Sequence, residues 1–195
     1  AAAVGEWMRR YKVPAYDEAT GKGLVRHVYV RVNRKGESLC CVVINGRQAP
    51  REPELAAYVC ATVPHTAGVL VNSNTKRGNV ILGEKYRTLW GRDYLMDTLC
   101  GLEFKLSVPS FYQVNRDQAE ALYGKALDYA GLTGRETVLD LYCGIGTITL
   151  CLAKRAGRVI GAEIVPAAIR DAKENAARNH IENAEFFCGD AAETA

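Results

Sequence analysis

Three carboxylates stand at the ends of predicted strands in the second half of the chain. Asp140 and Glu163 each end an apolar run, and Asp190 follows a third run. In an open parallel sheet, ligands bind outside the carboxyl ends of the strands, so we expect these side chains to face one ligand. A carboxylate after the second strand can accept both hydroxyls of a ribose, and one after the third can accept from an adenine amine. The pattern predicts a nucleoside-containing ligand.

A glycine-containing turn, Asp140–Thr147, links the first of these strands to a helix. Gly144 and Gly146 would let the backbone approach a ligand closely. A dinucleotide-binding turn needs Gly-x-Gly-x-x-Gly, but Thr149 occupies the third glycine position, and Asp140 would place negative charge beside a pyrophosphate. The turn therefore favours S-adenosylmethionine (SAM), which carries an adenosine, a sulfonium and an amino-acid end. In a structural alternative, Asp140 only accepts backbone N–H groups of the turn.

The elements that must position these residues alternate between strand and helix. Apolar residues at helical spacing, a cap at Asn115 and Gly131 at the end predict a helix over 116–130. Pro166 suits the first turn of a later helix. The βαβαβ order implies right-handed crossovers and a parallel sheet. The predicted elements are strands Thr137–Tyr142, Arg158–Glu163 and Ala184–Cys188, with helices Gly146–Arg155 and Pro166–Asn179.

The first half of the chain has another pattern, in which short strands are joined by polar turns. Two β-branched runs joined by a turn at residues 33–36 predict an antiparallel hairpin. A further turn signal, Asn45-Gly46, ends the returning strand. We predict helices over Glu6–Lys12 and Pro53–Ala61, and strands over Leu24–Val32, Ser38–Ile44, Thr66–Ser73, Val80–Leu82 and Glu84–Trp90, with further short strands between Tyr94 and Leu106. Residues 1–107 thus read as a hairpin-rich α+β domain, and residues 108–195 as an α/β domain.

Composition limits the classes of protein to consider. The 195 residues are 48% hydrophobic and 24% charged, which is typical of globular proteins, and no apolar run approaches the roughly 18 residues of a membrane span. Seven cysteines without a Cys-x-x-Cys pair indicate reduced thiols in a cytoplasmic protein, with no metal site. Residues 1–107 carry 16 Lys and Arg against 10 Asp and Glu, an excess that could attract a polyanion or simply form a solvated surface.

Three sequence elements, in this order, resemble the RNA (uracil-5-)-methyltransferases, which modify uridines in ribosomal and transfer RNA. Residues Ser110–Asn115 are similar to the family's Phe-x-Gln-x-Asn element, Asp140–Gly146 to its SAM loop, and Gly161–Ile169 to its ribose-binding strand end. Leu89-Trp90-Gly91 and the preceding hairpins look like the RNA-facing domain of the ribosomal members. The resemblance implies the first half of a Rossmann-like class I SAM methyltransferase sheet, preceded by a smaller α+β domain.

The same resemblance assigns roles to individual residues. It implies that Gln113 contacts the methionine end of SAM, and that Tyr142 and the backbone of Gly144 and Gly146 line the same pocket beside Asp140. Glu163 would hold the ribose and Asp190 the adenine. The implied partner is RNA, of the 23S ribosomal type, with neither DNA nor a membrane. On their own, Gln113 could instead make a helix-entry hydrogen bond and Glu163 could be a surface acid.

No catalytic residue can be assigned. In the family, the nucleophilic cysteine, the base and an Asp-Pro-Pro-Arg element lie downstream of the position of Asp190, and none has a counterpart here. Cys143 and Cys188 do not match the nucleophile. The family's iron–sulfur cysteine cluster and RNA-binding barrel, which lie upstream, likewise have no counterpart. With only three parallel strands, the hydrophobic strand Thr137–Tyr142 would lie at one edge of the sheet, with one side unpaired. We therefore expect a fragment of a longer enzyme, inactive alone.

Three functions are compatible with these residues. The first is a fragment of a SAM-dependent RNA uridine C5-methyltransferase. The second is a non-catalytic RNA-binding module with a vestigial nucleoside pocket. The third is a class I methyltransferase with a non-RNA substrate, against which the basic first half and the element around Gln113 argue. The sequence indicates no oligomeric state.

Overall fold

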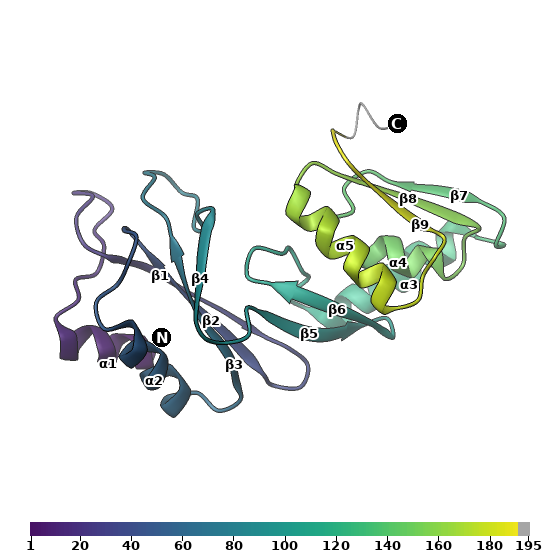
Figure 1. Ribbon diagram of the computed structural model, residues 1–195. Helices are drawn as coiled ribbons and strands as arrows, with labels where there is room; N and C mark the ends of the chain where they lie inside the picture. The colour runs from purple at the N-terminus through teal and green to yellow at the C-terminus, as the bar shows by residue number, and fades with distance from the viewer. Residues whose placement is uncertain (191–195) are drawn as a thin grey trace. The chain divides into compact units, whose positions relative to one another are not determined.

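The computed structural model describes residues 1–190, and the chain divides into two compact units. The first unit comprises residues 1–95 and 107–109, and the second comprises residues 96–106 and the chain from Ser110 onward (Figure 1). Residues 96–106 thus group with the second unit, although they precede the domain boundary expected after residue 107. No helix within residues 1–190 is long and apolar enough to cross a membrane.

A four-stranded sheet forms the centre of the first unit. Its order is β1-β2-β3-β4, and only the β2–β3 pair is parallel. The expected hairpin is confirmed, because β1 pairs antiparallel with β2 from Val32↔Ser38 onward. The strands are β1 (Val25–Val32), β2 (Ser38–Ile44), β3 (Thr66–Ser73) and β4 (Lys85–Gly91).

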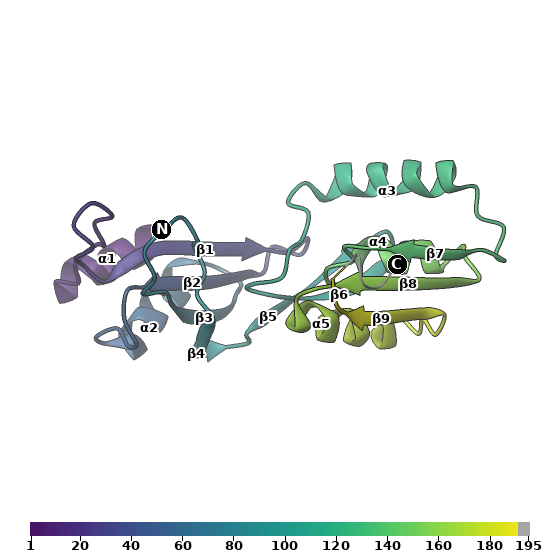
Figure 2. The ribbon, with the colours of Figure 1, turned by 90° about the horizontal axis from the view of Figure 1, so that it is seen from above.

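Two helices, α1 (Ala2–Tyr11) and α2 (Glu52–Thr62), lie on one face of this sheet (Figures 1 and 2). Strand β2 is buried at every position, and its side chains alternate between two cores. Cys40 and Val42 pack with the helices, whereas Leu39 and Cys41 pack on the opposite face. Helix α1 begins earlier than expected because Ala3, Val4 and Trp7 are already buried there.

The prediction of a strand over Val80–Leu82 is wrong. Two buried asparagines, Asn72 in β3 and Asn74 just after it, form hydrogen bonds with the backbone groups of this segment that a neighbouring strand would otherwise pair with. The Asn74 side-chain amide donates to the carbonyls of Val80 and Ile81, at 2.7 and 3.0 Å. Asn72 accepts the Gly83 N–H and donates to the Gly83 carbonyl. The segment is therefore a loop held by side chains, which local alternation of apolar residues does not reveal.

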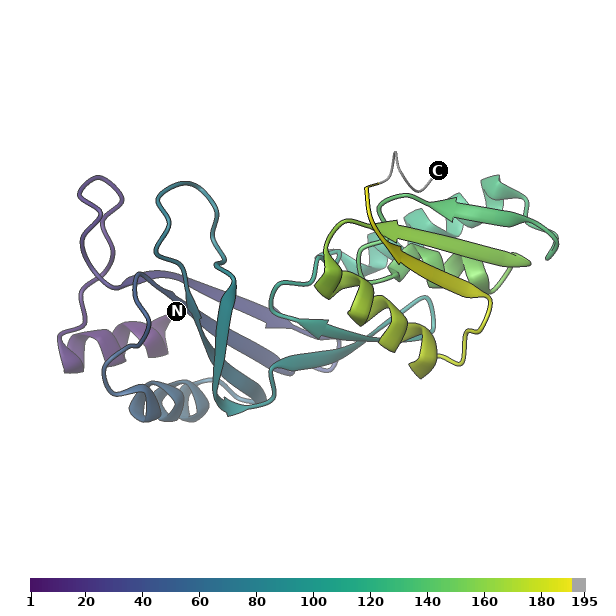
Figure 3. The ribbon, with the colours of Figure 1, turned by 45° about the horizontal axis from the view of Figure 1, so that its top comes forward.

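The second unit contains a parallel sheet of order β7-β8-β9 and most of a two-stranded sheet of β5 and β6, whose end residues Tyr94, Leu95 and Ser107 group with the first unit. Helices α3, α4 and α5 lie on one face of the parallel sheet (Figure 3), and their apolar residues share one core with Val159 and Phe186. The elements are β5 (Tyr94–Leu99), β6 (Leu102–Ser107), α3 (Arg116–Ala130), β7 (Thr137–Asp140), α4 (Thr147–Ala153), β8 (Arg158–Glu163), α5 (Pro166–Arg178) and β9 (Ala184–Cys188).

Local capping explains where these elements begin and end. The Asn115 side chain accepts the Gln118 N–H, and Gly131 adopts φ 57° at the end of α3, so this predicted helix is confirmed at both ends. Strand β7 is shorter than the predicted Thr137–Tyr142, because the carboxylate of Asp140 accepts the Tyr142 N–H at 3.4 Å and begins a turn. The predicted helix Gly146–Arg155 is likewise shorter, ending at Ala153.

Asn175 connects three parts of the second unit and is fully buried. Its Oδ1 accepts the backbone N–H of Lys105 on β6 at 2.8 Å. Its Nδ2 donates to the carbonyl of Ile145 in the turn before α4 at 3.2 Å. A buried amide with both ends paired stabilises this arrangement, because either backbone group left alone would be unpaired away from water.

We predict that Asn175→Ala lowers the free energy of unfolding by about 2 kcal/mol, since it leaves the two backbone groups without partners. Urea denaturation monitored by circular dichroism measures this change. The matched control is Lys173→Ala on the exposed face of the same helix, expected to change stability by less than about 0.5 kcal/mol. Equal stability of the two variants would contradict the role given to Asn175.

Glu52 supplies a buried carboxylate to the first unit. It accepts the Ala49 N–H at 2.8 Å and pairs with Arg87 on β4. Burial raises the pKa of Glu52, but the hydrogen bonds from Arg87 and Ala49 outweigh burial, so the pKa lies below its ordinary value. A carboxyl with a lowered pKa stabilises the fold when the pH is above the pKa of the group in the unfolded chain. This contribution is lost as the pH falls through the pKa of the group in the folded protein.

We predict that Glu52→Gln lowers the free energy of unfolding by about 1–3 kcal/mol at neutral pH. The difference from the wild type should shrink as the pH falls below about 4.3, the unfolded pKa of glutamate. Urea denaturation at neutral and acidic pH measures both effects. Glu54→Gln is the control, because Glu54 forms only an exposed pair with Arg51. A pH-independent difference for Glu52→Gln would refute the linkage.

Candidate functional site

The turn that follows β7 is fixed by the neighbouring strand and by its own backbone. Asp140 pairs in register with Gly161 on β8. Beyond the ladder, the Cys143 N–H donates to the carbonyl of Ala162 at 3.0 Å, and the Gly146 N–H donates to the Cys143 carbonyl at 2.8 Å. Backbone hydrogen bonds of the protein itself therefore hold the turn at the carboxyl edge of the parallel sheet.

The carboxylate of Asp140 is half-buried and occupied on both oxygens. Oδ2 accepts the hydroxyl of Thr149 at 2.6 Å, and Oδ1 accepts the Tyr142 N–H at 3.4 Å. The structural alternative for Asp140 thus describes part of what it does, since it accepts a backbone N–H of its own turn. Thr149 is fully buried and orients this carboxylate. The sequence did not predict this role, because Thr149 was noted only as the residue that replaces the third glycine of the dinucleotide-binding pattern.

Glu163 joins the end of β8 to the turn after β7. Its Oε2 accepts the Gly144 N–H at 3.2 Å, and its Oε1 accepts the Val165 N–H at 3.0 Å. Glu163 is only half-buried, and each oxygen accepts one hydrogen bond, so lone pairs stay available for further donors. It is not merely a surface acid, because it bridges two strand ends.

The two glycines of the turn have different roles. Both have positive φ, 54° at Gly144 and 85° at Gly146. A Cβ on Gly146 would lie 3.3 Å from the ring of Phe186 and 3.4 Å from Ala172, so this position serves close packing of α4 on the core. A Cβ on Gly144 would meet nothing within 4 Å. Gly144 therefore borders open space at the sheet edge, where a ligand can approach the backbone.

Asp190 lies at the same edge through the chain that follows β9. The Gly189 N–H donates to the backbone carbonyl of Glu163 at 3.1 Å, and Asp190 is the next residue, with an exposed side chain. The structure thus brings Asp140, Glu163 and Asp190 to the carboxyl ends of three adjacent strands, as the sequence predicted.

Tyr142 and Gln113 are less closely tied to this edge. Tyr142 is 82% exposed in the turn. Gln113 is half-buried on a segment anchored by Ser110, whose hydroxyl donates to Asp171 on α5 at 3.1 Å, and by the Asn115 cap of α3. Within residues 1–190, no hydrogen bond joins the Gln113 side chain to the other predicted site residues.

The charged side chains among the predicted site residues are all acidic. An acceptor-rich edge of this kind suits hydroxyl groups, amines and a positive centre, and it disfavours a phosphate. Cys143 lies within the turn, but burial, together with the charges of Asp140 and Glu163, raises the pKa of its thiol to about 12. A raised pKa disfavours the thiolate, which is the reactive form of cysteine, and so argues against Cys143 as a nucleophile.

The second half of the chain contains a match to a known protein family. Residues 132–195 match the family described as "Methyltransferase domain". The chain is 44% identical over 189 residues to a protein of Halalkalibacterium halodurans named as an uncharacterized RNA methyltransferase, covering 96% of this chain and 41% of that protein. A protein of Caldanaerobacter subterraneus with the same name is 44% identical over 191 residues, covering 97% and 42%. The chain spans about two fifths of these relatives.

A solved structure shares the fold across both units. The tRNA (uracil-54, C5)-methyltransferase of Pyrococcus abyssi, in complex with S-adenosyl-L-homocysteine, superimposes with a TM-score of 0.77 and 24% sequence identity, covering 96% of this chain and 45% of that one. The predicted fold class is confirmed: the chain contains a Rossmann-like methyltransferase sheet. The preceding α+β unit is about as large as the methyltransferase unit, not smaller as expected.

Proposed function

We propose that the second unit binds SAM and that the chain is the SAM-binding part of an RNA methyltransferase. The observation that carries this proposal is the contact between Glu163 and the Gly144 N–H, 3.2 Å long, beside the open space at Gly144. It places a carboxylate with free lone pairs next to a backbone that a ligand can approach. The RNA methyltransferase names of the relatives support the reaction class.

The residues present fit the parts of SAM. Glu163 would accept the ribose hydroxyls, and Asp190 would accept from the adenine amine. The backbone of Gly144 and Gly146, with Tyr142 and Gln113, would border the amino-acid end, and the fixed charge of Asp140 would favour the positive end of the ligand. When bound, SAM supplies a methyl group on a sulfonium. These protein groups bind and orient it.

We further propose that the acceptor is C5 of a uridine in RNA, with ribosomal RNA of the 23S type as the first candidate. The sequence elements around Gln113 and Glu163 support uridine C5, as does the shared fold with an enzyme named for uracil-54 of tRNA. Burial raises the pKa of the Cys143 thiol, which argues against this residue as the nucleophile. Attack on the base therefore requires a residue other than those of the predicted site.

Calorimetric titration with S-adenosyl-L-homocysteine tests SAM binding. We predict saturable binding to the wild-type chain and at least a tenfold weaker affinity for Glu163→Gln, because one acceptor oxygen becomes a donor, a change of about 1.4 kcal/mol or more. The control Glu182→Gln removes an exposed acid outside the site and should bind as the wild type does. A folded wild-type chain that does not bind would disprove the proposal.

Gly144 offers a second test with a closely matched control. Gly131 has a similar φ, 57°, and its Cβ would also meet nothing within 4 Å, so Gly144→Ala and Gly131→Ala should each cost about 1–2 kcal/mol of stability through the left-handed backbone. We predict that only Gly144→Ala weakens the binding of S-adenosyl-L-homocysteine, since its methyl group would enter the ligand's space. Equal affinities in the two variants would place the ligand elsewhere.

A further inference from the structure

A basic groove of about 880 Å³ lies within the first unit. It is bordered by the carboxyl ends of β2 and β3, the start of β4, and the loop of residues 74–84. The charged residues of its lining are the cations Arg47, Lys76, Arg77, Lys85 and Arg87 and the single acid Glu84. The first unit as a whole carries 15 Lys and Arg against 8 Asp and Glu. The excess of positive over negative residues is therefore a property of the whole unit, and it is stronger in the groove.

Side-chain hydrogen bonds hold the loop of residues 74–84 that borders this groove. Asn72 and Asn74 are buried, and their side chains bind the backbone at Val80, Ile81 and Gly83. A Cβ at Gly83 would lie 2.0 Å from the Ser73 carbonyl oxygen, so the close approach of the loop to β3 requires glycine. The loop therefore holds one shape and keeps its cations in place.

Arg26 on β1 fixes the other side of the loop. Its side chain is fully buried, and its guanidinium donates to the carbonyls of Asn74 and Lys76 at 3.0 and 2.7 Å. The same group stacks 4.6 Å above the ring of Tyr16. The guanidinium also pairs with Glu18 at 3.2 Å, so the charge of this buried arginine is compensated while it fixes the backbone at Asn74 and Lys76.

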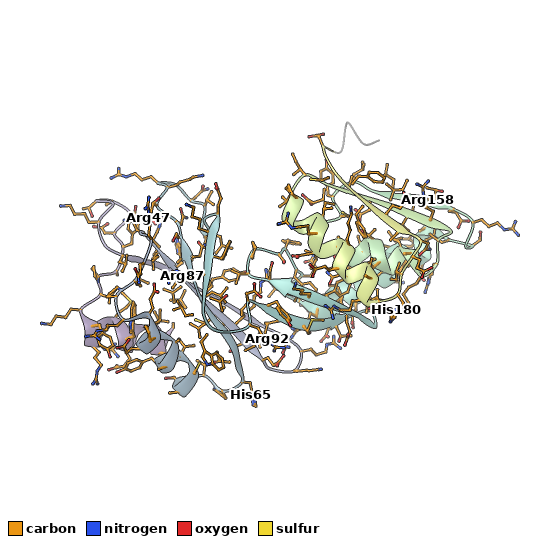
Figure 4. All side chains as sticks on the ribbon, in the orientation of Figure 1. Arg47, His65, Arg87, Arg92, Arg158 and His180 are labelled. Atoms are coloured by element: carbon orange, nitrogen blue, oxygen red, sulfur yellow. The ribbon has the colours of Figure 1, made fainter. Side chains whose placement is uncertain are left out.

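The cations of the groove fall into two groups. Lys76 pairs with Glu84 at 2.8 Å. Arg87 pairs with Glu52 and donates to the Arg47 carbonyl at 3.2 Å (Figure 4). Arg47, Arg77 and Lys85 are exposed, and none of the ion pairs within residues 1–190 uses them. Lys85 is near enough to Glu84 to lower the pKa of that carboxyl, but it forms no ion pair with it. Three cations outside the ion pairs, around one groove, form a site for successive negative charges.

We propose that this groove binds the phosphate backbone of the RNA substrate through Arg47, Arg77 and Lys85. The inference rests on the proposed function, which makes RNA the polyanion that the protein must hold. Lysine and arginine contacts to phosphates position a nucleic acid without reading its sequence. The groove would therefore orient the RNA strand, and the recognition of one uridine would belong to other groups.

Fluorescence anisotropy with a labelled single-stranded oligouridine of about 20 nucleotides tests the proposal, with salt varied from about 50 to 200 mM. The test variant carries Arg47→Gln, Arg77→Gln and Lys85→Gln. The control carries Arg9→Gln, Arg10→Gln and Lys35→Gln, three exposed cations of the same unit located on α1 and in the β1–β2 turn. Both triple variants lose three positive charges, so a difference in their RNA affinities reflects where on the unit the charges lie.

We predict that the groove variant binds the oligouridine at least about tenfold more weakly than the wild type, and that the slope of log affinity against log salt falls by about 2, as for three lost phosphate contacts. The control should lose less than about threefold through general electrostatics. Equal losses in both variants, an unchanged salt slope, or no RNA binding by the wild type would each overturn the groove as an RNA site.

Titration of the groove variant with S-adenosyl-L-homocysteine separates this inference from the proposed function. The variant should bind that ligand as the wild type does, because all its substitutions lie in the first unit. A wild-type chain that binds oligouridine through the groove but does not bind S-adenosyl-L-homocysteine would disprove the SAM proposal and leave the groove standing. The opposite result would disprove the groove alone.

Discussion

The hydrogen bond from the Gly144 N–H to the carboxylate of Glu163 is the contact on which the site depends. It forms because β7 and β8 are adjacent and parallel, which brings the turn after one strand to the end of the next. The Gly189 N–H adds the end of β9 by donating to the Glu163 carbonyl. Side-chain and backbone groups of Glu163 thus hold the three strand ends together, and the carboxylate keeps lone pairs for a ligand.

The same turn is packed on one side and open on the other. Gly146 lies against Phe186 and Ala172, where a Cβ would be in tight contact, whereas Gly144 borders free space. Asp140 is held by Thr149 and by a backbone amide of its own turn. Rigid support from the core and open access at the sheet edge together suit a preorganised small-molecule site.

Much of this architecture could be predicted from the sequence, because its signals are local. Asn115 and Gly131 mark the ends of α3, and the apolar runs ending in Glu163 and Cys188 mark β8 and β9 as observed. The loop at Val80–Leu82 could not be predicted, since its shape depends on amides of Asn72 and Asn74 from another part of the chain. The pairing of Glu163 with Gly144 and the support of Asp140 by Thr149 are likewise tertiary contacts, invisible to periodicity.

In the proposed function, a nucleoside ligand lies across the ends of β7, β8 and β9. The most direct measurement is a ¹⁵N–¹H correlation spectrum of the chain during titration with S-adenosyl-L-homocysteine. We predict that the largest changes in chemical shift occur at the amides of Gly144, Gly146, Val165 and Asp190, the residues at or next to the strand ends. Changes confined to the far end of the sheet, around His180 and Ile181, or no changes at saturating ligand, would contradict it.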